Sequence, residues 1–206
     1  MRTLIFAAAV LAAGPALAQS APNVFNGPFI GIQGGWQQDR QTLEIQAGGF
    51  TTRGTESADG LLYGGQVGYD MRLASPLVLG VEASVTGRTG SRIFDDGINS
   101  FRLSQGRTIT TSARLGVLVG RDSLFYGRLG YANAQYRLQN GGFTVTDKRD
   151  GYMIGAGYEQ VVSRNVSGRF EYNYSDFGKD RMPSLAAGSE LQYRRHALTA
   201  GLNFRF

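Results

Sequence analysis

Arginine and glutamate recur at alternate positions inside segments that are otherwise apolar. Residues two apart on a β-strand point to the same face of a sheet, so this spacing collects the charges on one face. On an enclosed face they would form ion pairs, because an unpaired buried charge is costly. The sequence therefore predicts an interior charge network, with glycines beside it to make room, that consists of Glu82, Arg114, Arg128, Glu159, Arg169 and Glu171.

Such a network is compatible with two kinds of chemistry. In the first, paired charges fill the space that the strands enclose and hold the strands together. In the second, the same charges line a narrow path for ions or small solutes. The eight strands inferred below enclose little more than their own side chains, which favours the first interpretation.

Catalytic chemistry finds less support in the residue types. Acyl hydrolysis needs a nucleophile beside a base, and the chain has one histidine, His196, with Leu198 where a His-x-Ser motif would need its serine. The chain has no cysteine, and no residues have the spacing of metal ligands. We expect no enzyme and no cofactor, and a lipid-modifying enzyme is the least supported function.

The elements that would position these residues are strands. Eight segments alternate apolar and polar residues with a period of two, which is typical of β-strands. They lie near residues 28–37, 61–71, 77–87, 110–120, 124–136, 151–161, 166–177 and 191–206.

The connections between these segments alternate in length. Short ones surround Ser75, Asp122 and Asn165, whereas long ones cover roughly residues 39–60, 88–107, 139–150 and 178–190. Short turns at one end and long loops at the other are typical of outer-membrane barrels. The pattern predicts an all-β fold: an eight-stranded antiparallel up-and-down transmembrane β-barrel with four extracellular loops and three periplasmic turns. Residual alternation within 41–55 and 143–150 indicates that some strands continue into the loops as hairpins.

The first residues have the layout of a secretory signal peptide. Arg2 precedes an apolar run from Leu4 to Ala13, and small residues follow at Ala16 and Ala18. This predicts a signal peptide over 1–18 and one mature domain over 19–206. The formal net charge is +5 without a basic run, so we expect no nucleic-acid partner.

Aromatic residues fall into two groups along the predicted strands. Residues of one group lie toward the short turns and those of the other toward the long loops, as the interfacial girdles of a membrane barrel require. The predicted girdles comprise Trp36, Tyr63, Tyr69, Phe125, Tyr131, Tyr152, Tyr158 and Tyr174. The alternative is a soluble barrel with its apolar face inside, because alternation alone does not distinguish the two faces.

Two stretches carry a resemblance to a known family. Residues 150–178, with Gly155-Ala156-Gly157 and Arg169-x-Glu171-Tyr172-x-Tyr174, and the final TAGLNFRF are similar to those of small OmpA/OmpX-type outer-membrane barrels. The resemblance implies residence in the cell outer membrane. It also implies an assembly signal, read by the barrel-assembly machinery, at Thr199, Gly201, Phe204 and Phe206.

These observations favour a structural surface protein of the outer membrane. Its lumen would be plugged by Arg/Glu pairs, and it would contribute to envelope integrity. We expect contacts with outer-membrane lipid and lipopolysaccharide, and contacts of the loops with host or envelope proteins. A small-solute porin with a narrow pore is the alternative function.

Overall fold

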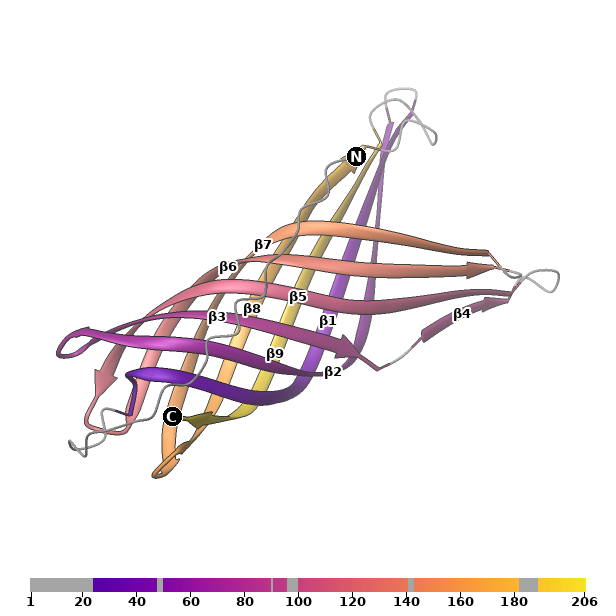
Figure 1. The fold of residues 1–206 in the computed structure, drawn as a ribbon. Helices are drawn as coiled ribbons and strands as arrows, with labels where there is room; N and C mark the ends of the chain where they lie inside the picture. The colour runs from indigo at the N-terminus through magenta and orange to yellow at the C-terminus, as the bar shows by residue number, and fades with distance from the viewer. Residues whose placement is uncertain (1–23, 48–49, 90, 96–99, 141–142, 182–188) are drawn as a thin grey trace, which may run out of the picture.

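The computed structural model describes residues 24–47, 50–89, 91–95, 100–140, 143–181 and 189–206, so the predicted signal peptide lies outside the described residues. The described chain is built from long antiparallel strands (Figure 1). They are β1 (Gly27–Ala47), β2 (Phe50–Ala74), β3 (Leu77–Arg88), β4 (Ser91–Asp95), β5 (Ser100–Val119), β6 (Ser123–Asn140), β7 (Phe143–Ser163), β8 (Val166–Arg181) and β9 (Glu190–Arg205).

Eight of these strands close into a ring. The order around it is β3-β2-β1-β9-β8-β7-β6-β5, and β3 pairs with β5 to complete the circle. Each strand otherwise pairs with its neighbour in sequence, and β1 pairs with β9 from Phe29↔Arg205 to Glu44↔Glu190. The predicted eight-stranded up-and-down barrel is confirmed. The short strand β4, which the sequence did not indicate, pairs with β5 beyond the end of β3.

Much of the chain assigned to long connections is paired strand. β1 and β2 stay paired from Gly27↔Asp70 to Ala47↔Phe50, and β6 and β7 stay paired to Asn140↔Phe143. The expectation that strands continue into the loops is therefore confirmed. Figure 1 shows these extensions splayed, with the β6/β7 hairpin leaning away from the β1/β2 and β8/β9 hairpins.

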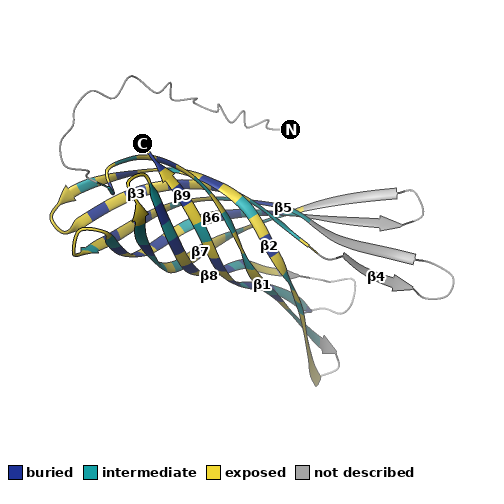
Figure 2. Cartoon of the chain, turned by 90° about the horizontal axis from the view of Figure 1, so that it is seen from below, coloured by how far each residue is buried: buried dark blue, intermediate teal, exposed yellow. Residues whose placement is uncertain are grey.

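The two faces of the sheet differ sharply in chemistry. Outward side chains such as Ile32, Leu129 and Val81 are 68%, 62% and 58% exposed. The intervening inward side chains are buried and mostly polar, so exposed and buried residues alternate along the strands (Figure 2). The soluble barrel with an apolar interior is therefore wrong, because the apolar face is the one left without protein contacts. Among the described residues, no helix is long and apolar enough to cross a bilayer.

Two small apolar clusters lie inside the barrel, one toward each end. Phe25, Val78, Leu124 and Tyr126 pack together toward the short turns. The other cluster lies where the strands extend toward the long hairpins and contains Ala132, Ala134, Met153, Phe177 and Tyr193. Apolar side chains therefore pack beside the polar interior toward both ends of the barrel.

Glycines give the interior room for large side chains. A Cβ added at Gly80 would collide with Asp70 Oδ1 and the side chain of Arg114. A Cβ at Gly157 would lie 2.6 Å from the ring and hydroxyl of Tyr126. The expected role of inward-facing glycines thus has a physical basis at these two positions.

Candidate functional site

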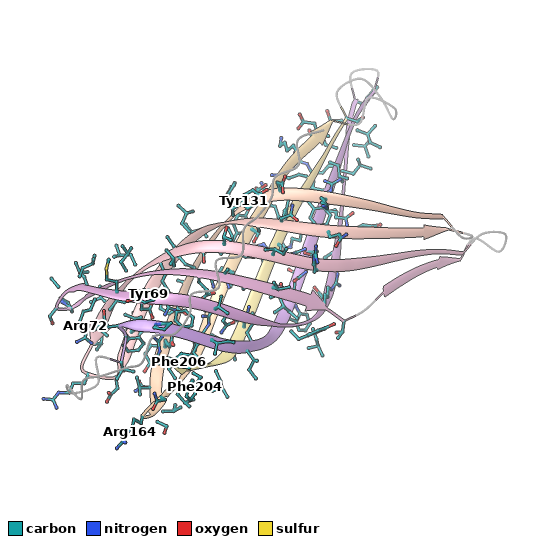
Figure 3. All side chains as sticks on the ribbon, in the orientation of Figure 1. Tyr69, Arg72, Tyr131, Arg164, Phe204 and Phe206 are labelled. Atoms are coloured by element: carbon teal, nitrogen blue, oxygen red, sulfur yellow. The ribbon has the colours of Figure 1, made fainter. Side chains whose placement is uncertain are left out.

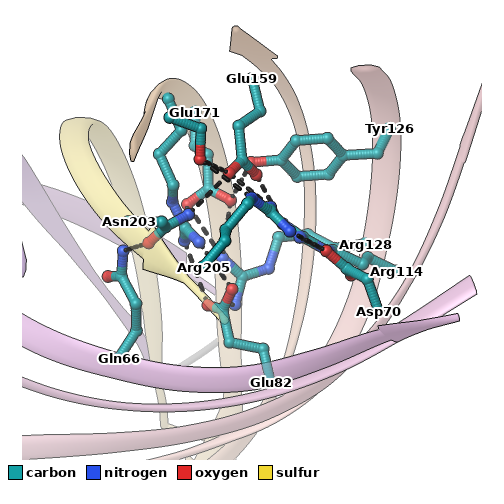
Figure 4. Close-up of polar contacts among 12 residues, drawn as sticks. Gln66, Asp70, Glu82, Arg114, Tyr126, Arg128, Glu159, Glu171, Asn203 and Arg205 are labelled. Carbon is teal, nitrogen blue, oxygen red and sulfur yellow. Dashed lines mark hydrogen bonds and ion pairs between the residues drawn. The ribbon is translucent and has the colours of Figure 1, made fainter. Parts of the chain in front are cut away.

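The half of the lumen toward the short turns, which we call the lower half, holds four carboxylates and four guanidinium groups (Figure 4). They come from seven strands, β2, β3 and β5 to β9, because each strand contributes inward side chains at this level. We call this set the lumen network; it comprises Asp70, Glu82, Arg114, Arg128, Glu159, Arg169, Glu171 and Arg205.

Four members of the lumen network form a closed ring of alternating charge. Arg114 reaches Asp70, with Nε 2.9 Å from Oδ1, and Glu159, with Nη1 3.1 Å from Oε2. Arg205 joins the same two carboxylates from the other side, at 2.8 Å to Asp70 Oδ2 and 2.6 Å to Glu159 Oε1. We call this the first ring. Each charge in it has two opposite neighbours, so its formal charge is zero.

The other four members form a second ring with the same pattern. Arg169 contacts Glu82 at 2.6 Å and Glu171 at 2.7 Å. Arg128 contacts Glu82 at 3.1 Å and Glu171 at 2.9 Å. The Tyr126 hydroxyl donates to Glu171 Oε1 at 2.6 Å, and the Arg114 guanidinium stacks 4.9 Å from the Tyr126 ring centre. Tyr126 therefore links the second ring to the first.

Neutral polar side chains form additional hydrogen bonds with the charged groups of the first ring. Asn203 donates to Glu159 Oε1 at 2.8 Å and accepts from Gln66 at 2.7 Å. Arg205 donates to the Ser167 hydroxyl at 3.0 Å. No member of either ring is more than 6% exposed. The ion pairs and hydrogen bonds of the rings offset the cost of desolvation, and among the described residues the buried Arg169 Nε is left without a hydrogen-bond partner.

A small polar cavity of about 50 Å³ lies above the second ring. Arg128 and Thr199 belong to its wall, as does Asn173, whose buried Oδ1 has no hydrogen-bond partner among the described residues. A cavity of this size holds very few water molecules.

A further charged cluster lies beyond this cavity, toward the long hairpins. Asp39 accepts from Arg195 at 2.7 Å and from Arg88 at 3.2 Å. Arg195 also donates to Thr108 at 3.0 Å and stacks 5.0 Å from the Phe177 ring centre. This upper cluster therefore narrows the lumen a second time.

All six residues proposed from the sequence lie in the lumen network. The prediction omitted its other two members, Asp70 and Arg205. The signal for both was present, because Asp70 shares its face with Gln66 and Arg205 shares its face with Asn203. The upper cluster was missed for a different reason. Asp39 stands in a stretch assigned to a loop, and only the extension of β1 places it inside the barrel.

The polar lumen, the apolar outer face and the closed ring of strands agree with the comparisons with known proteins. The family model described as outer membrane protein beta-barrel domain matches residues 4–206. This chain belongs to that family. Like other members, it is a protein of the outer membrane.

Individual relatives have names that agree with this assignment. The 31 kDa outer-membrane immunogenic protein of Brucella melitensis is 26% identical over 99% of this chain and 94% of its own length. The 22 kDa outer membrane protein of Rhizobium leguminosarum is 27% identical over 70% of this chain and 66% of its own.

Solved structures show the same fold at low identity. Neisserial surface protein A (NspA) matches with a TM-score of 0.54 and 18% identity, covering 88% of this chain and all of its own. The Escherichia coli outer membrane protease OmpT matches with a TM-score of 0.51 and 10% identity, covering 91% of this chain and 99% of its own. At these identities the likeness concerns the fold alone.

The aromatic residues assigned to the two girdles lie on the outer face, six of them exposed and Tyr158 and Tyr174 partly buried. Figure 3 shows Tyr69, Phe204 and Phe206 toward the short turns and Tyr131 toward the long hairpins. Their contact with the membrane interfaces stays a prediction.

The residues of the expected assembly signal lie on β9 and directly after it. Thr199 points into the lumen, and the Phe204 and Phe206 rings meet edge to face at 5.0 Å between centres. The Phe206 N–H donates to the Pro28 carbonyl at 3.1 Å, next to the β1–β9 seam. Recognition of this segment by the assembly machinery stays a prediction.

His196 lies on the outer face, away from the lumen network. Its Nδ1 is 2.7 Å from the Tyr172 hydroxyl, and its ring centre is 5.2 Å from that of Tyr174. Among the described residues, His196 has no serine or threonine as a hydrogen-bond partner. Its surroundings are those of an interfacial aromatic cluster rather than of a general base beside a nucleophile.

Proposed function

We propose that the protein is a closed structural barrel of the outer membrane, without enzymatic activity, that contributes to envelope integrity. The observation that carries this proposal is the pair of alternating charge rings in the lumen. Each ring joins strands that are not neighbours in the sheet, so it braces the barrel across its width. The upper cluster and the two apolar clusters fill further parts of the lumen.

This arrangement opposes the passage of ions. An ion crossing the lumen would have to separate buried charges, each of which contacts two opposite charges, and pass the apolar side chains of the two clusters. Arginine is permanently charged and presents a planar, multiply donating head. Neither ring would therefore open by losing a proton from its arginines.

The extended hairpins support a second part of the same proposal, which is contact with host or envelope proteins at the cell surface. Long connections of outer-membrane barrels face the outside. The name of the Brucella relative, an immunogenic protein, agrees with exposure of such hairpins in that protein.

Single-channel recording in planar bilayers tests the closed lumen. The unmodified protein should show negligible conductance, whereas an Arg128→Ala, Glu171→Ala double variant should conduct, because it removes bulk and charge from the second ring together. A matched control, Lys179→Ala with Glu190→Ala, removes an ion pair from the exposed extension and should stay closed. Large, stable conductance of the purified unmodified protein would refute the proposal.

A narrow porin is the second candidate, because the lumen contains the polar cavity of about 50 Å³. For this function the cavity would have to connect through both charge rings. The same recordings distinguish the candidates, since a porin conducts without any substitution.

A further inference from the structure

Basic side chains gather on the outer face of the barrel where the strands extend beyond the upper aromatic girdle. Arg40 on β1, Arg53 on β2, Lys179 on β8 and Arg194 on β9 line a pocket of about 360 Å³. We call it the rim pocket. The rest of its wall consists of Thr42, Glu44, Thr55 and Gln192.

The height of the rim pocket on the barrel is set by β1. Trp36, a girdle residue, and Arg40 lie on the same face of this strand, four residues apart. A strand rises about 3.3 Å per residue, so Arg40 lies roughly 13 Å along the strand beyond Trp36. The girdle residues of a barrel lie at the membrane interface. With the predicted girdle at the membrane interface, the pocket lies at the level of the head groups of the outer leaflet.

The β1–β9 register creates an electrostatic conflict in this pocket. Arg40 is directly opposite Arg194, and like charges directly opposite each other on neighbouring strands repel. An anion that contacts both guanidinium groups would remove this repulsion.

The acidic residues around the pocket do not supply that anion. Glu44 pairs with Arg53 at 3.2 Å and Glu190 pairs with Lys179 at 2.8 Å. Asp176 approaches Arg194 at 3.6 Å, a long contact. Arg40 has no hydrogen bond or ion pair with any residue that the structure describes. One arginine is thus left over, beside a second that is only loosely paired.

We propose that the rim pocket binds a phosphate group of a phosphorylated glycolipid of the outer leaflet. Two guanidinium groups on adjacent strands offer several N–H donors to a tetrahedral anion, and arginine is well suited to phosphate. The threonine hydroxyls of Thr42 and Thr55, which lie 3.5 Å apart, add neutral donors. Because the pocket lies just beyond the girdle, a phosphate on a membrane lipid can reach it without leaving the membrane, which favours a lipid phosphate over a free one.

Retention of lipid A by the full chain in nanodiscs tests this assignment, with native mass spectrometry as the readout. The unmodified protein should retain lipid A that bears its phosphates and should not retain enzymatically dephosphorylated lipid A. An Arg40→Gln, Arg194→Gln variant should lose retention roughly tenfold or more, because it removes charge-assisted hydrogen bonds. A matched control, Arg121→Gln with Arg164→Gln, removes the same charge at the short turns and should bind normally.

A second variant separates binding from folding. Arg40→Glu places a carboxylate opposite Arg194 and replaces repulsion by a cross-strand ion pair, so it should fold normally, as judged by heat-modifiable gel mobility. It should nevertheless lose lipid A. Equal retention by the unmodified protein and both Arg40 variants would overturn the proposal, as would equal retention of dephosphorylated lipid A.

A spectroscopic arm identifies the source of the phosphate. His196 is the single histidine of the chain and is one face-sharing position below Arg194 on β9, so its imidazole resonances should move when phosphorylated lipid A is added to the nanodiscs. Inorganic phosphate at millimolar concentration should not reproduce the movement. If it did, and displaced lipid A, the pocket would be a site for free phosphate and the assignment to a lipid would be wrong.

Discussion

The lumen network and the rim pocket are two arginine-rich regions with opposite pairing. In the lumen, four arginines meet four carboxylates in two closed rings. In the rim pocket, Arg40 is directly opposite Arg194, and Arg194 has only a long contact of 3.6 Å to Asp176 among the described residues. Burial explains the difference. A charge away from water must be paired, whereas water can solvate unpaired positive charge at the exposed rim. An unbalanced charge can therefore persist only where water or a ligand reaches it.

Breaking one ring should have the largest effect on stability. Glu171→Ala leaves Arg128 and Arg169 with one carboxylate less and removes the acceptor of the Tyr126 hydroxyl. We expect a loss of about 3–5 kcal/mol in the free energy of unfolding, measured by urea titration in lipid vesicles. The matched rim variant, Glu44→Ala, should cost less than about 1 kcal/mol. Similar losses in the two variants would contradict the distinction between the regions.

A charge placed on the outer face would have neither an ion-pair partner nor water. It therefore tests what an unpaired charge costs, in contrast to the paired charges of the lumen. Leu129 lies between Phe125 and Tyr131 on the outer face of β6 and is 62% exposed. Leu129→Arg should cost about 2–4 kcal/mol, as for arginine near the middle of the membrane. The same titration measures it, with Leu129→Met as the uncharged control. A harmless Leu129→Arg would mean that this face does not contact lipid.

Crowding a ring without changing its charge tests how tightly it is packed. Gly80→Ala introduces a methyl group that collides with Asp70 and Arg114, so it should cost about 1–3 kcal/mol, as overpacking does. Gly54→Ala, whose added Cβ meets nothing within 4 Å, is the matched control on β2. Equal tolerance of the two substitutions, seen as equal urea midpoints, would show that the first ring can move apart freely.

The smallest effect is expected for an exposed ion pair. Lys179→Ala removes the 2.8 Å contact to Glu190, and the Lys179 side chain is 54% exposed. The loss of stability should be small, because solvent screens the pair, and it should vanish in high salt. Unfolding titrations at low and high salt check this. A salt-independent loss would mean that Lys179 contributes through packing.

The alternation of residues was sufficient to predict the barrel and the inward charges, because a period of two assigns faces directly. The alternation did not predict which arginine pairs with which carboxylate. Arg205 reaches Asp70 and Glu159 on strands far from β9 in the sequence, and such contacts depend on strand tilt and stagger. The expected continuation of strands into the loops did not predict the inward position of Asp39, because polar residues such as Asp39 and Arg40 continue both faces of β1. There, hydrogen bonding between strands persists after the apolar pattern has ended.

One strand, β9, completes both the first ring of charges and the closed ring of strands. Without β9 between β8 and β1, Asp70 and Glu159 would share Arg114 alone, and the first ring would carry one surplus negative charge. Docking brings Arg205 to both carboxylates and neutralises that charge in the same step that seals the β1–β9 seam. Neutrality of the first ring and pairing across the β1–β9 seam therefore depend on the same strand, so a barrel open at this seam would lack both.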